Sequence, residues 1–70
     1  MAYTAADLKM VEDHIAQGER HVARQREILA FLSSRGYPTD QAQWLLTAFE
    51  ATLLQHREHR ELMLADSDVA

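Results

Sequence analysis

Apolar and small side chains recur at alternating intervals of three and four residues through the first half of the chain. This spacing places them on one face of an α-helix, whereas a strand would require alternation at every second residue. Thr4, followed three residues later by Asp7, marks a helix start. The pattern predicts one long helix over residues 5–34, with a seam formed by Leu8, Val11, Ile15, Gly18, Val22, Gln25, Leu29 and Leu32.

Glycine and proline interrupt this periodicity just after its last member. Gly36 favours the left-handed conformation that ends helices, and Pro38 cannot continue a helix that precedes it. Thr39 or Asp40 can cap a second helix, and Asp40 with Gln43 three residues later matches a variant of the capping box. The segment therefore predicts a helix stop followed directly by a helix start.

These signals together predict an all-α fold in which two helices, at about 5–34 and 40–65, form an antiparallel hairpin. At about 1.5 Å per residue the first helix would be roughly 45 Å long, so only a helix of similar length can cover it. Residues 66–70 are expected to form a frayed tail. The chain is predicted to be a single domain over residues 1–70.

The second helix has a broader apolar surface than one neighbouring helix can cover. Its apolar side chains are Trp44, Leu45, Leu46, Ala48, Phe49, Leu53, Leu54, Leu62, Met63 and Leu64. The core of so short a chain rarely contributes more than about 3 to 5 kcal/mol to the free energy of unfolding. The absence of cysteine excludes disulfides as a further source of stability. We therefore expect a homodimer that forms a four-helix bundle. The residues expected in its core or interface are Leu8, Val11, Ile15, Gly18, Val22, Leu29, Leu32, Leu45, Leu46, Phe49, Leu53 and Met63.

The net charge of −4 comes from the second half of the chain, because residues 1–36 hold equal numbers of acidic and basic side chains. A negative balance disfavours nucleic acid, since Lys and Arg supply most of the affinity for phosphates. No stretch approaches the length of a membrane span, and the N-terminal residues lack the features of a signal peptide. We expect a cytoplasmic protein without nucleic-acid or membrane partners.

The hairpin also predicts which residues of the two helices lie level with each other. If the chain reverses near Tyr37 and every residue advances equally, Gly18 lies level with His56. The acidic pair Glu12 and Asp13 then lies beside Arg57 and Arg60. The basic stretch 20–35 would then lie beside the acidic first half of the second helix. Opposite charges therefore favour the antiparallel arrangement.

In this register His14, His56 and His59 fall within about two turns of one another. Such a cluster could bind Zn²⁺ or a similar ion. However, the Glu-x-x-His motif of di-metal bundles is absent, because the residues three before the four histidines are Val11, Gly18, Leu53 and His56. We favour structural or surface histidines, with no metal or cofactor, and keep a histidine metal site as the alternative.

Gly18 occupies a seam position in the middle of a helix, where glycine costs about 1 kcal/mol relative to alanine. We interpret it as making room for a bulky group, with His56 expected nearby. A kink or a binding notch is the alternative.

Little in the sequence indicates catalysis or phosphate binding. There is no cysteine and no glycine-rich phosphate loop, and two helices offer no evident pocket. We therefore expect a protein that is not an enzyme and has no catalytic residues. Arg20, Arg24 and Arg26 could form a phosphate-binding stripe, but Glu27 and the lack of interleaved aromatic residues favour a solvated face.

Two segments of the chain resemble a group of small uncharacterised helical proteins of alphaproteobacteria, especially of the rhizobial type. They are the run His14-Ile15-Ala16-Gln17-Gly18-Glu19-Arg20-His21-Val22-Ala23-Arg24-Gln25-Arg26-Glu27-Ile28 and the later positions Ala42 to Leu46, Phe49, Glu50, Leu53, His56, His59 and Arg60. The resemblance covers roughly residues 8–64. It implies a bacterial, cytoplasmic protein and transfers no activity or ligand residues.

The sequence as a whole favours a helical interaction or regulatory module that self-associates. One alternative is a metal-binding bundle built on the histidines. Another is a groove on the second helix that receives a helix of a different protein.

Overall fold

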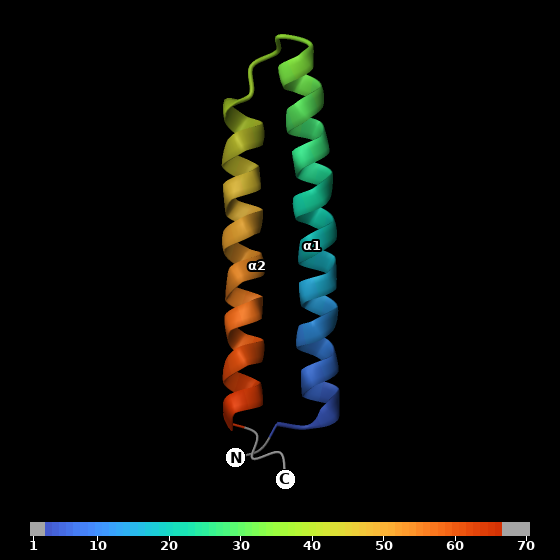
Figure 1. Ribbon diagram of the computed structural model, residues 1–70, viewed down its shortest axis with the longest axis vertical. Coiled ribbons are helices and arrows are strands. Elements are labelled where there is room, and N and C mark those ends of the chain that lie inside the picture. The colour runs from blue at the N-terminus through green and yellow to red at the C-terminus, as the bar shows by residue number, and fades with distance from the viewer. Residues whose placement is uncertain (1–2, 67–70) are drawn as a thin grey trace.

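Two antiparallel helices lie side by side in the computed structural model, which describes residues 3–66 (Figure 1). Helix α1 comprises Ala5–Ser34 and helix α2 comprises Asp40–Asp66. No strand occurs in this part of the chain, and the predicted all-helical, two-helix fold is confirmed. Asp66, which the sequence placed in the tail, belongs to α2, while the rest of the predicted tail lies outside the described residues.

A capping box begins α1 at the predicted position. The Thr4 hydroxyl accepts a hydrogen bond of 3.1 Å from the Asp7 backbone N–H, and the Asp7 carboxylate accepts one of 3.0 Å from the Thr4 N–H. Both bonds satisfy backbone donors that have no partner inside the helix. The Asp7 charge also lies at the end of the helix dipole that favours an anion.

A Schellman motif ends α1 at Gly36, as the sequence predicted for this glycine. Gly36 adopts a φ of 72°, which places it in the left-handed region. Its N–H donates to the Ser33 carbonyl at 3.1 Å, and the Tyr37 N–H donates to the Leu32 carbonyl at 2.9 Å. The last carbonyls of α1 are thus satisfied although the helix has stopped.

Thr39, directly before α2, is the residue that Gln43 contacts. The Thr39 carbonyl accepts a 2.8 Å bond from the Gln43 N–H, and its hydroxyl lies 3.3 Å from the Gln43 side-chain nitrogen. Of the two predicted caps, Thr39 therefore receives the first hydrogen bond of the helix, and Asp40 is its first residue.

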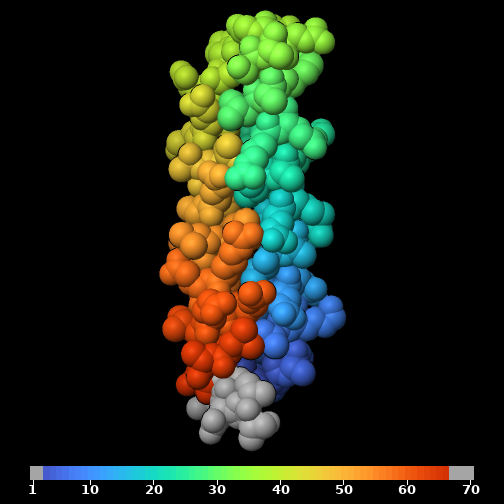
Figure 2. All heavy atoms as spheres, viewed as in Figure 1, coloured from blue at the N-terminus to red at the C-terminus, as the bar shows by residue number. Residues whose placement is uncertain are grey.

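The core is a thin seam along a rod of 54 × 14 × 12 Å. Its central cluster consists of Ile15, Val22 and Leu53, against which the half-buried Leu46 and Phe49 pack. On the face shown in Figure 2, side chains fill the space between the two ribbons of Figure 1. The buried residues are Val11, Ile15, Val22, Gln25, Ala42, Leu53 and Met63.

Leu53, and not His56, packs on Gly18. A Cβ atom added to Gly18 would lie 3.1 Å from Leu53 Cδ1. The expected register of His56 against Gly18 is therefore wrong by about one turn. The interpretation that glycine makes room for a bulky side chain holds, with leucine as that side chain.

The connection between the helices explains this shift. Tyr37, Pro38 and Thr39 are not helical, and the chain descends beside the end of α1 before α2 begins (Figure 1). An extended residue advances about 3.3 Å and a helical one about 1.5 Å, so three extended residues displace α2 by roughly 5 Å, close to one helical turn. The sequence-based register assumed equal advances and therefore missed this turn.

One buried polar side chain joins the two helices near the loop. Gln25 on α1 donates a hydrogen bond of 2.9 Å from its side-chain nitrogen to the backbone carbonyl of Ala42 on α2. Both residues are buried. Because a buried amide without a partner is costly, this bond makes a polar residue acceptable at a seam position.

Replacing Gly18 by leucine is expected to destabilise the protein, although leucine is the better helix former. Overpacking against Leu53 costs about 1 to 3 kcal/mol, whereas the gain in helix propensity is about 1 kcal/mol. Urea unfolding of Gly18→Leu should therefore show a lower midpoint than the parent. A Gly18→Leu protein more stable than the parent would contradict the observed packing.

Replacing Gln25 by glutamate is expected to lower the free energy of unfolding at pH 7 by about 2 kcal/mol, because a buried carboxylate would face the Ala42 carbonyl without donating a bond. A protonated carboxyl can donate, so the folded-state pKa of the new side chain would be raised. The loss should then shrink as the pH falls towards 4. Gln17→Glu, at an exposed position of the same helix, serves as the control and should show neither effect.

Candidate functional site

Cross-helix ion pairs occupy one side of the hairpin. Arg26 pairs with Glu50 and Arg57 pairs with Glu19, each at 3.0 Å. Arg57 thus meets Glu19 and not the expected Glu12 or Asp13, while Arg26 lies beside the acidic half of α2 as predicted. We call these four residues the ion-pair face. Exposed pairs of this kind are each worth between zero and about 1 kcal/mol, so they indicate a solvated surface.

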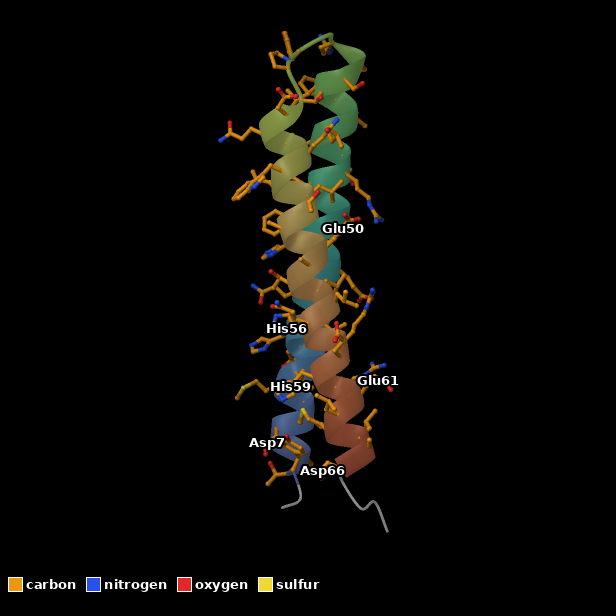
Figure 3. All side chains as sticks on the ribbon, turned by 90° about the vertical axis from the view of Figure 1, so that its left-hand side faces the viewer. Asp7, Glu50, His56, His59, Glu61 and Asp66 are labelled. Carbon is orange, nitrogen blue, oxygen red and sulfur yellow. The ribbon has the colours of Figure 1, made fainter. Side chains whose placement is uncertain are left out.

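The four histidines share the opposite side of the hairpin, which we call the histidine face. His14 on α1 contacts His56 on α2, with ring centroids 5.1 Å apart and ring planes inclined by 45°. His21 contacts the Phe49 ring at 5.4 Å. Figure 3 shows His56 and His59 on one side of the molecule, with Glu50 on the other.

Two shallow grooves follow the histidine face. The one nearer the loop has a volume of about 220 Å³ and contains His14, His21 and His56 among its lining residues. The one nearer the start of α1 has a volume of about 370 Å³ and is lined by Tyr3, Asp7, Met10, Val11, His14, His56, His59 and Met63. His14 and His56 are therefore shared by both grooves.

The three histidines singled out as possible metal ligands are only partly brought together. His14 and His56 form a contact, whereas the His59 ring lies edge-on to Tyr3, with centroids 6.3 Å apart. Across residues 3–66 no group of three or more His, Asp or Glu side chains is placed to hold a metal ion.

Two of the three arginines considered as a phosphate-binding stripe lie beside acidic side chains. Arg26 bonds to Glu50, and Arg24 lies 3.8 Å from Glu27 on the same helix. Such exposed pairing of opposite charges is typical of a solvated helix surface.

The outer surface of α2, directed away from α1, carries the most exposed large apolar side chains. Trp44 is 69% exposed and Leu62 is 66% exposed. They are separated by about five full turns of helix, so they point in the same direction. Ala48 and Ala51 lie on the same surface between them. Sequence reasoning named Trp44 and Leu62 as widening the apolar surface of this helix, but it missed their alignment, which the 3.6-residue period could have revealed.

The expected core and interface residues lie at different depths. The buried ones are Val11, Ile15, Val22, Leu53 and Met63. The half-buried ones are Leu8, Gly18, Leu29, Leu32, Leu45, Leu46 and Phe49. Ala42 is buried but was missed, because an alanine in the first turn of a helix gives little hydrophobic signal.

Neither described helix has an apolar stretch long enough to cross a bilayer. No family model, no curated protein and no solved structure matches this chain. The resemblance to alphaproteobacterial proteins, and the bacterial cytoplasmic origin that it implies, therefore stay predictions.

Proposed function

We propose that this chain is a non-enzymatic interaction module that self-associates as a symmetric homodimer, with two α2 helices at the centre of a four-helix bundle. The observation that carries the proposal is the line of apolar and small side chains along the outer surface of α2. We call this line the outer seam and define it by Trp44, Ala48, Ala51 and Leu62.

The outer seam has the composition of a helix–helix contact. Large side chains stand at both ends, and Ala48 and Ala51 leave room for a second backbone to approach. The longer Gln55 and Glu58 occupy the half of the line nearer Leu62. Trp44 and Leu62 are both about two-thirds exposed in the single chain. Isolated exposed apolar side chains are ordinary, but an aligned set on one helix surface is typical of an interface.

The outer seam is also complementary to itself. When two α2 helices cross in antiparallel directions about a two-fold axis at the level of Leu53, on the side of α2 away from α1, Trp44 lies opposite the Leu62 of the other copy. Ala51 then lies opposite Gln55, and Ala48 opposite Glu58, so short side chains face long ones. Closed two-fold symmetry of this kind is the commonest arrangement of identical chains.

A second copy would also account for the stability of so thin a molecule. No large side chain within residues 3–66 is fully buried. Two helices held by one seam are marginal in water, since helical stability in proteins comes mostly from tertiary packing. A dimer would place a second seam beside the first.

The ion-pair face is a poor alternative interface. Glu19, Arg26, Glu50 and Arg57 are about half-exposed and already paired within the chain. Burying these charges against another molecule would cost desolvation free energy, and no new ion-pair partners would offset that cost.

Sedimentation equilibrium over micromolar concentrations tests the proposal. The parent should approach twice the chain mass of 8.0 kDa. Trp44→Glu should weaken the dimer by at least about 30-fold, because a tryptophan buried in an interface contributes about 2 kcal/mol or more to the free energy of binding. The chain has a single tryptophan, so its fluorescence should shift to shorter wavelength as the concentration rises and Trp44 leaves water.

Met10→Glu is the matched control, because Met10 is an exposed apolar residue (59%) on the histidine face. It should leave the dimer intact. If Met10→Glu dissociates the dimer and Trp44→Glu does not, the interface is the histidine face and the proposed seam is wrong. A parent mass of 8.0 kDa at all concentrations would exclude the homodimer and favour a partner helix from another protein.

A further inference from the structure

The contact between His14 and His56 differs from those of the other two histidines. It joins two imidazole rings from different helices, His14 being exposed and His56 half-buried. His21 instead contacts the phenyl ring of Phe49, and His59 contacts the phenol ring of Tyr3. Within residues 3–66, the His14–His56 contact is therefore the one ring contact that brings two imidazoles together.

The separation of the two rings matches the requirement of a shared metal ion. A ligating imidazole nitrogen lies about 2.1 Å from Zn²⁺ and about 1.1 Å from the centre of its ring, so each ring centre lies about 3.2 Å from the ion. At the tetrahedral angle, the two ring centres are then about 5 Å apart. The observed separation of 5.1 Å agrees with this distance. A shared ion further requires that the two side chains rotate so that one nitrogen of each ring faces it.

The surroundings leave space for the remaining ligands. The groove of about 370 Å³ opens beside the pair, and Asp7, Met10 and Met63 also line it. Water or a thioether sulfur could complete the coordination there. Imidazole ligands suit Zn²⁺, Co²⁺, Ni²⁺ and Cu²⁺, whereas Mg²⁺ and Ca²⁺ prefer oxygen.

We propose that His14 and His56 form a two-imidazole site for a divalent transition-metal ion such as Zn²⁺, which clamps α1 to α2. Both ligands come from one chain, so the site does not require the homodimer and goes beyond the proposed function. The competing explanation is a simple packing contact between two neutral rings. Only a metal site predicts that added metal stabilises the fold through these two side chains.

Calorimetric titration and thermal unfolding of the metal-free protein, with ZnCl₂ and with MgCl₂, test the site. We expect one Zn²⁺ per chain, a rise in Tm with Zn²⁺ and no rise with Mg²⁺, because a ligand that binds only the folded state stabilises it. His14→Gln or His56→Gln should weaken Zn²⁺ binding by about 100-fold, since the second imidazole acts at high effective concentration. His21→Gln, on the same face, should bind Zn²⁺ as the parent does.

Two further measurements keep the test decisive. If a glutamine variant unfolds, Co²⁺ gives an independent readout, because nitrogen ligands in tetrahedral geometry produce a visible absorption band on the folded parent. The Trp44→Glu variant should retain full Zn²⁺ binding even as a monomer, which separates this site from the dimer. The site is overturned by the absence of any Tm rise at about 1 mM Zn²⁺, by the absence of the Co²⁺ band, or by equal binding to parent and His14→Gln.

Discussion

The non-helical connection from Tyr37 to Thr39 determines which side chains of the two helices meet. A residue that advances as in a strand displaces α2 further than a helical residue would, and three such residues amount to about one helical turn. That turn brings Leu53 onto Gly18. It also brings His56 onto His14. The central packing and the proposed metal site therefore both depend on three residues of non-helical backbone.

The same register divides the surface of the hairpin into chemically distinct parts. Paired charges lie on one side, and imidazole and aromatic rings lie on the other. The outer seam of α2 faces away from α1. Since α1 covers only one stripe of α2, Trp44 and Leu62 on the outer seam stay about two-thirds exposed in the described part of the chain. A second copy is the partner that we propose for them.

The sequence predicted the ends of the helices well, because these depend on local chemistry. The start of α1 depends on hydrogen bonds between Thr4 and Asp7, three residues apart. Its end depends on bonds from Gly36 and Tyr37 to the last turn of the same helix. The register could not be predicted in the same way, because it depends on the path of a connection that has no periodic pattern. Thus His56 was expected at Gly18, and the Gln25–Ala42 bond was not anticipated although Gln25 was placed in the seam.

The Gln25 amide gives the hairpin a means of rejecting wrong pairings. Leucines along a seam pack nearly as well after one helix slides by a turn, so apolar contacts alone discriminate poorly between registers. A slipped hairpin would carry the Gln25 amide away from the Ala42 carbonyl. Where the larger side chains of the next turn block the backbone carbonyls there, the buried amide loses its acceptor at a cost of about 1 to 3 kcal/mol. A bond that adds little to the stability of the correct structure thereby raises the energy of its nearest competitors, and it does so next to the connection where the register is set.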